Sequence, residues 1–396
     1  MSFGTPDHVR PVRDAVHQFL TERVEPAEPV LYAGGPEATT VMAELKAEAK
    51  RSGLWALGHP RELGGGGMPF LDYVFVNEVQ GRSEFGQVAL GTLTLQDSIM
   101  LDKYASPALR TTYLEPLVRG DISPSFGMTE PDVASSDPTQ LATTAVLEGD
   151  EWVINGRKWF TTGAMQASYC TVMARTEPEA APHAAFSMII VPTDTPGYRV
   201  VRETPVLGMS SGHCEVAYDD VRVPVGNLLG ERGAGFTIAQ QRLGPGRIFH
   251  AMRWLGQAQR AFDLMCDRLN NRVAFGEQLS RKQLMQQHVF ESFAEIQACR
   301  LLTLDAARKI DAGEQAREEI GVIKVVGARM LHNVVDRALQ VHGALGLTDD
   351  TPLSRMYRNA RLGRIYDGPD EVHVHTVGRR LLSRYARGEN WEFGLS

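Results

Sequence analysis

Residues 358–373 read RNARLGRIYDGPDEVH. An acidic residue, Asp367, follows an apolar and basic run and stands directly before a Gly-Pro pair. Gly and Pro together are typical of a turn, so this carboxylate lies where a regular element ends. Asp370 and Glu371 follow where a helix is expected to begin, and acidic residues are favoured in the first turn of a helix. Helix capping therefore explains Asp370 and Glu371 better than a catalytic role does. Asp367 is the candidate for the catalytic carboxylate.

A second informative stretch, residues 126–137, reads FGMTEPDVASSD. Its small and hydroxyl residues can bring backbone N–H groups and hydroxyl oxygens close to a planar ring and a phosphate. Taken alone, the stretch also fits a plain turn before a strand. Three further segments accompany it along the chain: GRKWFTTG at 156–163, NRVAFG at 271–276 and QVHGALG at 340–346.

Together these segments resemble the acyl-CoA dehydrogenase family of flavoenzymes, and the resemblance extends over nearly the whole chain. It implies FAD as cofactor and α,β-desaturation of an acyl-CoA thioester to a trans-2-enoyl-CoA, with Asp367 as general base. The family usually has Glu at this position. The Asp-Gly-Pro-Asp-Glu motif at 367–371 resembles a subgroup with Asp as the base, associated with long or branched acyl chains.

The resemblance also implies which residues hold the flavin. One set comes from the first two segments: Phe126, Met128, Thr129, Ser135, Ser136, Trp159, Phe160 and Thr161. Trp159 would stack near the ring, and Thr161 would bond its reactive nitrogen, which tunes hydride acceptance. A second set would reach the flavin of a neighbouring subunit: Arg272, Phe275, Gln283, Gln340, Val341, Gly343 and Ala344. Glu371 stands where the family usually has a Gln that contacts the flavin.

Substrate contacts are expected from Ser136, Arg247 and Gly368. Arg247 follows a Gly-Pro-Gly run, and it could be a surface charge, an ion-pair partner or, as the resemblance implies, a contact to the CoA moiety. Some family members carry their catalytic carboxylate at this place. The residues at 244–246 offer none, which strengthens the case for Asp367.

Asp is one methylene shorter than Glu, and a misplacement of about 1 Å can cost on the order of 100-fold in rate. Either the turn is shifted inward, or the substrate is shaped so that its α-carbon lies closer, or the chemistry differs. One alternative is therefore an FAD-dependent oxidase of the same fold, like a nitroalkane oxidase. Another is a non-catalytic subunit that binds flavin or acyl-CoA.

The chain alternates between two kinds of pattern, which predicts an α+β fold that is mostly α. Residues 1–122 show helical spacing of apolar side chains, as do residues 232–396, where Pro245 suits a first helical position. Residues 123–231 contain short β-like runs, with a hairpin turn predicted at Asn155–Gly156. We expect an N-terminal helical domain, a central small β-barrel or sandwich domain and a C-terminal four-helix bundle, which is the family's architecture.

Composition excludes several other classes of function. A net charge of −7 gives no broad positive field for nucleic acid. No run of about 18 apolar residues predicts a membrane span, and the polar N-terminus favours a cytoplasmic location. The four cysteines and the histidines lack the spacing of metal ligands, so no metal is expected.

The resemblance further implies partners. Electrons would pass to an electron-transfer flavoprotein, as in fatty acid β-oxidation. A flavin site shared between chains implies a homodimer or homotetramer. Whether the thioester is carried by CoA or by an acyl carrier protein stays open, as do its chain length and branching.

Overall fold

The computed structural model describes residues 4–210 and 212–391. These residues form two compact units, each described here by itself. One unit contains residues 4–54, 68–90 and 244–391 and is helical, and the other contains residues 55–67, 91–210 and 212–243 and holds the large sheet. The prediction of a mostly α fold with helical N-terminal and C-terminal domains around a β-domain is confirmed, whereas the boundaries at 122 and 231 stay a prediction. None of the described helices is both long and apolar enough to span a bilayer.

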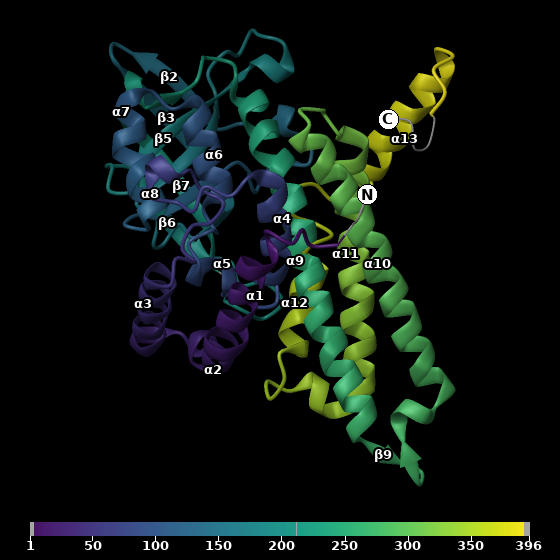
Figure 1. Cartoon of the computed structure of the whole chain (residues 1–396). Coiled ribbons are helices and arrows are strands. Elements are labelled where there is room, and N and C mark those ends of the chain that lie inside the picture. The colour runs from purple at the N-terminus through teal and green to yellow at the C-terminus, as the bar shows by residue number, and fades with distance from the viewer. Residues whose placement is uncertain (1–3, 211, 392–396) are drawn as a thin grey trace. The chain divides into compact units, whose positions relative to one another are not determined.

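The helical unit begins with short N-terminal helices and ends with a bundle of long ones (Figure 1). Its helices are α1 (Arg10–Phe19), α2 (Glu25–Ala33), α3 (Gly35–Arg51), α4 (Phe70–Gln80), α5 (Gly86–Ala89), the main part of α9 (Gly235–Asn271), α10 (Gln283–Asp311), α11 (Arg317–His342), α12 (Leu353–Leu362) and α13 (Asp370–Ala386). A π-helical turn, Leu20–Val24, joins α1 to α2, and a 3-10 turn, Gly343–Leu347, follows α11. The small strands β9 (Val273–Ala274) and β10 (Glu277–Gln278) pair between α9 and α10.

Two glycines set how closely α4 approaches α9. A Cβ atom on Gly256 would lie 2.0 Å from the carbonyl oxygen of Glu78, and one on Gly81 would lie 2.2 Å from that of Arg253. Both contacts are with backbone atoms, which cannot rotate away. Any side chain at either position would therefore force the two segments apart.

The helix α9 corrects one sequence-based prediction. Pro245 was expected at the first helical position, but it lies inside α9, which begins at Gly235. Proline cannot donate the hydrogen bond to the carbonyl one turn earlier, so this helix continues with one bond fewer. Apolar side chains on both sides of Pro245, such as Ile238 and Ile248, are fully buried, and their packing offsets that loss.

The other unit is built on one sheet with the strand order β6-β7-β3-β2-β4-β5-β8, and β1 pairs with β4 in parallel. Its strands are β1 (Pro124–Gly127), β2 (Thr144–Glu148), β3 (Glu151–Thr162), β4 (Tyr169–Arg175), β5 (Phe186–Pro192), β6 (Tyr198–Glu203), β7 (His213–Pro224) and β8 (Leu228–Leu229). The helices α6 (Leu95–Tyr104), α7 (Pro107–Leu109) and α8 (Glu115–Arg119) precede them. Buried side chains from α6, α8, β4 and β5 share one hydrophobic cluster, so helices pack on this sheet.

The predicted hairpin turn at Asn155–Gly156 is wrong. These residues lie inside β3, and the register against β7 shifts between Ile154 and Gly156. Gly156 has φ +150°, and a Cβ there would lie 2.5 Å from Thr143 Oγ1. The Asn-Gly pair therefore serves a bulge and a close contact, both of which favour glycine in a strand. The turn that joins β2 to β3 lies at Gly149–Asp150 instead.

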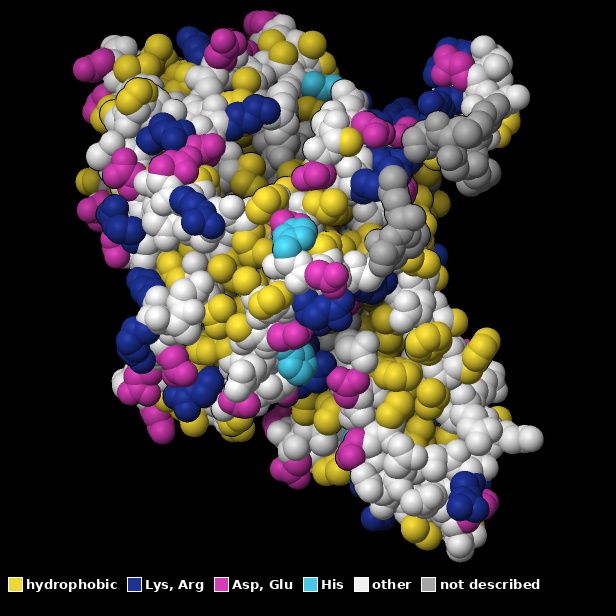
Figure 2. Space-filling view, viewed as in Figure 1, with side chains coloured by type: hydrophobic (Ala, Val, Ile, Leu, Met, Phe, Trp, Pro, Cys, Tyr) yellow, Lys and Arg dark blue, Asp and Glu magenta, His cyan; other side chains and the backbone are white. Residues whose placement is uncertain are grey.

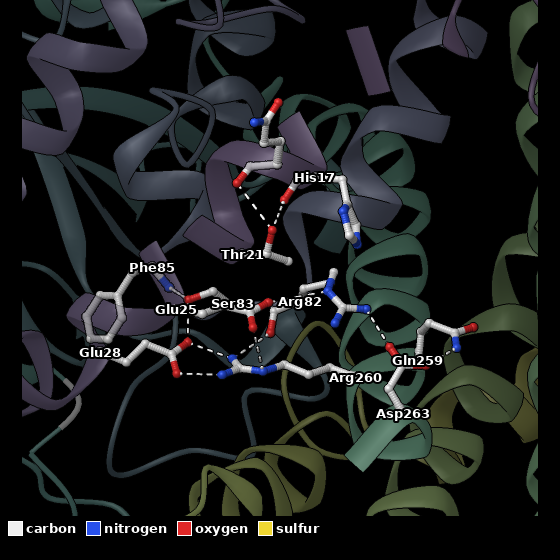
Figure 3. Close-up of polar contacts among 11 residues, drawn as sticks. His17, Thr21, Glu25, Glu28, Arg82, Ser83, Phe85, Gln259, Arg260 and Asp263 are labelled. Carbon is white, nitrogen blue, oxygen red and sulfur yellow. Dashed lines mark hydrogen bonds and ion pairs between the residues drawn. The ribbon is translucent and has the colours of Figure 1, made fainter. Parts of the chain in front are cut away.

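A buried ion-pair network holds the helical unit together (Figure 3). Arg260 of α9 donates to both carboxylate oxygens of Glu28 in α2, at 2.8 and 2.9 Å. Ser83, in the segment after α4, donates to Glu28 Oε1 at 2.6 Å. Arg82 adds an ion pair of 3.3 Å to Glu25 and one of 2.8 Å to Asp263. The network thus ties α2, the segment after α4 and α9 to one another.

We expect Glu28→Gln to lower the free energy of unfolding by about 3 kcal/mol, because it leaves the Arg260 charge buried beside a neutral group. Glu25, which lies 3.4 Å from Arg260, keeps the loss at the lower end of the range for broken buried pairs. Urea unfolding followed by circular dichroism measures the change. The control is Glu48→Gln at the more exposed pair with Arg23, where about 0–1 kcal/mol is expected. Equal losses in the two variants would contradict a special role for the buried pair.

A second prediction concerns His59, which is fully buried in the sheet-containing unit. Burial lowers the pKa of His59 from 6.5 to about 4. Between pH 6.5 and 4 the unfolded chain therefore binds the additional proton, and the free energy of unfolding falls as the pH falls through this window. His59 contributes at most about 1.4 kcal/mol per pH unit to that slope.

We expect His59→Leu to reduce the slope of unfolding free energy against pH between 6.5 and 4.5, measured by urea unfolding at several pH values. Between pH 8 and 7, where His59 is neutral in both states, the two proteins should show the same slope. An unchanged slope at low pH would mean that His59 takes up its proton without unfolding.

Candidate active site

Asp367 lies in the short turn between α12 and α13, in the helical unit. Its φ is +54°, a left-handed conformation that non-glycine residues rarely adopt. Gly368 follows with φ +98°, and a Cβ on it would lie 2.7 Å from His373 Nε2. A strained residue followed by an obligatory glycine is typical of a turn that the surrounding structure holds in place.

Two cationic side chains and a histidine hold this turn through its carbonyl groups. Arg247 of α9 donates to the carbonyl oxygen of Asp367 from Nη2 at 3.0 Å and from Nε at 3.2 Å. His373 of α13 lies 3.1 Å from the same oxygen. Lys324 of α11, which is fully buried, donates to the carbonyl of Gly368 at 3.1 Å and to that of Gly363 at 2.6 Å. Three helices thus fix the backbone on which the carboxylate is mounted.

His250 of α9 faces the carboxylate of Asp367. Its Nε2 lies 3.1 Å from Asp367 Oδ2, and only about a fifth of either side chain is exposed. Burial, together with the nearby charge of Arg253, lowers the pKa of His250 to about 4, so the ring is neutral near pH 7. On its other side, Arg253 Nη2 lies 2.6 Å from His250 Nδ1.

This arrangement fixes the tautomer of His250. An arginine side chain can only donate hydrogen bonds, so Nδ1 must accept. The single ring proton of the neutral imidazole is then on Nε2, where it points toward Asp367. The side chains of Arg253, His250 and Asp367 therefore form a chain of contacts that ends at the candidate base.

Sequence reasoning missed His250, Arg253 and Lys324. The missed signal on α9 was its spacing: His250 and Arg253 follow Arg247 at intervals of three residues, which places all three on neighbouring positions of a helix surface. Lys324 carried no local signal, because its partners Gly363 and Gly368 are far away in the sequence. Arg247, predicted as a substrate contact, is found on the carbonyl of Asp367.

A second group of candidate residues lies in the sheet-containing unit. Lys158 of β3 is completely buried and donates to the carbonyl of Met128 at 2.9 Å and to Glu130 Oε1 at 2.8 Å. The backbone N–H of Trp159 donates to the carbonyl of Thr129 at 2.9 Å. Burial lowers the pKa of Lys158 to about 8, and the Glu130 carboxylate opposes this effect. The predicted flavin segments at 126–130 and 158–161 are therefore side by side.

Two polar atoms in these segments fit a bound flavin. Thr161 Oγ1 and Trp159 Nε1 are buried, and neither has a hydrogen-bond partner among the residues that the structure describes. Buried polar atoms normally have a partner, so a ligand that supplies one is the simplest account. Phe160 is a second indication of a ligand site. It has φ +50°, and its side chain remains 42% exposed beside the ring of Trp159. These residues fit a planar, hydrogen-bonding cofactor such as FAD.

The two serines of this region differ in their surroundings. Ser135 Oγ accepts from the backbone N–H of Glu130 at 2.9 Å, so it closes the loop after β1. Ser136 is exposed. Phe126 and Met128 are half-buried against the hydrophobic cluster of the unit.

The residues predicted to reach a neighbouring subunit lie around one end of the bundle (Figure 1). Phe275, at the tip of the β9–β10 hairpin, is 98% exposed and has φ +53°. Arg272, Gln283 and Gln340 are exposed as well, as are Gly343 and Ala344 in the turn after α11. Val341 is the exception, because its side chain is buried. Glu371 is exposed in the first turn of α13, whereas the neighbouring Asp370 is buried and pairs with Arg329 and Arg364.

Comparison with known proteins identifies the family of the chain. Models of three acyl-CoA dehydrogenase domains match the chain in succession: the N-terminal domain at residues 6–121, the middle domain at 125–221 and the C-terminal domain at 233–382. A solved structure from Mycobacterium abscessus, assigned as an acyl-CoA dehydrogenase, has a TM-score of 0.91 and 39% identity, covering 96% of this chain and 100% of that one.

Curated relatives give the same assignment. A Mycobacterium tuberculosis protein named probable acyl-CoA dehydrogenase FadE2 is 45% identical, over 97% of this chain and 98% of that protein. Acyl-CoA dehydrogenase family member 11 of Rattus norvegicus is 39% identical over 94% of this chain, which spans 50% of that protein's length. The chain therefore belongs to the acyl-CoA dehydrogenase family and is an FAD-dependent oxidoreductase that acts on CH–CH groups.

Proposed function

We propose that this protein desaturates an acyl-CoA thioester between its α- and β-carbons, with Asp367 as the general base. The observation that supports this most directly is the strained turn at 367–368, which carries a partly buried carboxylate and whose backbone carbonyls are held by Arg247, His373 and Lys324. Structures retain backbone strain where the surrounding contacts over-determine it, and such positions cluster at active sites.

In this mechanism the carboxylate of Asp367 takes the α-proton of the thioester. FAD, when bound, supplies the acceptor for the β-hydrogen as hydride. His250 is neutral, and its Nε2 lies 3.1 Å from Asp367 Oδ2, where the ring limits the positions that the carboxylate can take. Because Arg247 and His373 hold the carbonyl of Asp367, the turn cannot rotate away from this position.

The contacts that hold this turn also affect how far the carboxylate of Asp, which is one methylene shorter than Glu, reaches toward the substrate. A left-handed residue changes the direction in which its side chain leaves the backbone, and three helices fix the turn in that conformation. We propose that the placement of this turn compensates for the missing methylene of Glu. In addition, we assign the flavin contact of the serine pair to Ser136, because Ser135 is engaged within its loop.

We further propose a homodimer or homotetramer in which one chain completes the flavin site of another. Phe275 exposes almost its entire side chain, which is unusual for an aromatic residue with no partner to cover it. Figure 2 shows hydrophobic side chains gathered at the lower right of the view, where Figure 1 places α10. Leu284, Phe290 and Phe293 of α10 are each more than half exposed. A second copy of this chain would cover them.

An electron-transfer flavoprotein is the acceptor that we propose for the reduced enzyme. An oxidase of the same fold would instead release a stoichiometric amount of hydrogen peroxide during turnover in air, so a peroxide assay separates the two. A non-catalytic flavin-binding subunit would show neither peroxide nor flavin bleaching.

Substitution of the base tests the proposal. We expect anaerobic titration of the wild-type protein with acyl-CoAs of several lengths to bleach the flavin absorbance. Asp367→Asn should keep bound FAD but lose bleaching by at least about 100-fold in rate, because an amide cannot accept the α-proton. Asp350→Asn, which removes the same charge from an exposed turn, is the control and should bleach like the wild type. Bleaching by Asp367→Asn at the wild-type rate would exclude Asp367 as the base.

A second prediction concerns the buried hydroxyl of Thr161. Thr161→Val keeps the shape but removes the hydroxyl, and a hydrogen bond of this kind contributes about 0.5–1.5 kcal/mol. We expect FAD to bind about 2- to 13-fold more weakly, measured by titrating the apoprotein with FAD and following flavin fluorescence. The variant without FAD should be at least as stable as the wild type, because the hydroxyl has no partner among the described residues. Unchanged FAD affinity would remove Thr161 from the flavin site.

A further inference from the structure

The helical unit contains a pocket of about 240 Å³ beside the turn of Asp367. Its wall comes from the segment after α4, from α9 and from α12, together with Tyr366, the residue that precedes Asp367. Trp254 forms part of the wall and donates from Nε1 to the hydroxyl of Tyr366 at 2.9 Å. The residue that precedes the candidate base thus forms part of the pocket wall.

The lining of this pocket is unusually polar for a space that would receive a hydrocarbon chain. Its polar side chains include Glu84, Gln87, Arg253, Gln257 and Asn359. Ligand pockets are mostly apolar and have a few polar groups that fix the ligand's orientation. Here polar groups occupy several sides of the lining, so a purely apolar occupant would leave them without partners.

Arg253 is the charged group in this lining that has no carboxylate in direct contact among the described residues, and the Asp367 carboxylate attracts it only across the ring of His250. Its guanidinium contacts the neutral ring of His250, and no carboxylate among the described residues forms an ion pair with it. Glu84 lies in the same lining, but burial raises its pKa, which favours the uncharged acid. A buried charge without a counter-charge is costly, and an anionic or oxygen-bearing ligand would offset that cost.

Gln257 provides an independent observation. Its Oε1 atom is buried and has no hydrogen-bond partner among the residues that the structure describes. Gln257 lies four residues after Arg253, one turn further along α9. The Gln257 amide and the Arg253 guanidinium therefore both line the pocket. A hydroxyl group could donate to this oxygen, and a carboxylate or hydroxyl oxygen could accept from Arg253.

The wall of the pocket is held rigidly before any ligand binds. Ser83 lines the pocket, and its hydroxyl is fixed by Glu28, which Arg260 holds in turn (Figure 3). Gly81 packs so closely on the backbone of Arg253 that the two segments cannot move nearer to each other. A preorganised polar pocket increases affinity, because few side chains lose conformational freedom when the ligand binds.

We infer that the acyl chain of the substrate carries an oxygen-bearing group, a carboxylate or a hydroxyl, which binds to Arg253 and Gln257 in this pocket. The inference rests on the dehydrogenation proposed above and names its substrate class. The pocket offers about 240 Å³, which is below the roughly 300–1,000 Å³ typical of ligand pockets. This space fits a short acyl chain that ends in a polar group rather than a long hydrocarbon tail.

Discrimination against a plain acyl chain should be substantial. A site built to hydrogen-bond a substrate group rejects an analogue without that group, because its own buried polar atoms are then left unpaired. A hydrogen bond to a charged group contributes about 1.5–3 kcal/mol, which corresponds to a factor of about 10 to 100 in kcat/KM.

The test compares three six-carbon thioesters on the FAD-loaded enzyme: hexanoyl-CoA, adipoyl-CoA and 6-hydroxyhexanoyl-CoA. Anaerobic flavin bleaching gives the rate for each, and the measured quantity is the ratio of kcat/KM for an oxygenated thioester to that for hexanoyl-CoA. We expect a ratio of about 10 to 100 for at least one of the two oxygenated thioesters. Preference for adipoyl-CoA would identify the carboxylate, and preference for 6-hydroxyhexanoyl-CoA the hydroxyl.

Three variants identify the residues responsible. Arg253→Met should bring the adipoyl ratio close to one, whereas Arg253→Lys keeps the charge and should retain part of it. Gln257→Leu should lower the hydroxyl ratio, and it removes a buried oxygen without a partner, so this variant is expected to fold. Because the readout is a ratio within each variant, a general loss of rate through His250 does not affect it.

The outcomes are separable. If hexanoyl-CoA bleaches the wild-type flavin as well as the oxygenated thioesters do, the dehydrogenation stands and the inference about the pocket is overturned. The same holds if the preference survives in both Arg253→Met and Gln257→Leu. If none of the three thioesters bleaches the flavin, the proposed function fails, and the substrate class fails with it.

Discussion

The geometry of the candidate site depends on how the backbone carbonyls of residues 367 and 368 are held. A left-handed aspartate is unfavourable by itself, and a turn of this kind would relax if its neighbours allowed it. Arg247, His373 and Lys324 approach from three different helices and occupy these carbonyl oxygens. The position of the carboxylate is therefore set by the packing of the bundle as a whole. For this reason the local motif alone does not determine it.

The protonation state of the site follows from the same packing. Burial keeps His250 neutral, and the guanidinium of Arg253 leaves only one tautomer open to it. A neutral donor orients the carboxylate without adding a positive charge that would stabilise it permanently and weaken it as a base. Lys324 and Arg247 donate their hydrogen bonds to backbone oxygens of this turn.

Much of the fold could be predicted from the sequence, because long helices and buried strands have clear periodicity. Helical spacing in the first and last parts of the chain, with short β-like runs between them, predicted the order of helices and sheet, and Asp367 became the candidate base through its Gly-Pro turn. The errors have physical causes. Asn155–Gly156 has the composition of a turn but meets Thr143 inside a continuous strand, and Pro245 is accepted within α9 because its neighbours are buried. His250, Arg253 and Lys324 were missed because their roles arise from contacts between helices, which one local motif does not record.

The close contact of Gly81 and Gly256 with backbone carbonyls has a consequence for how specificity can change, whether in evolution or in the laboratory. These main-chain contacts leave no room for a Cβ, so a side chain at either glycine would push α4 and α9 apart and disturb the packing of both segments together with the pocket. New acyl groups are more easily accommodated by exchanging side chains on an unchanged frame, with Arg253, Gln257 and Asn359 as the positions open to variation. A mutant library directed at these three positions would alter polarity and size, while both glycines would have to be left as they are.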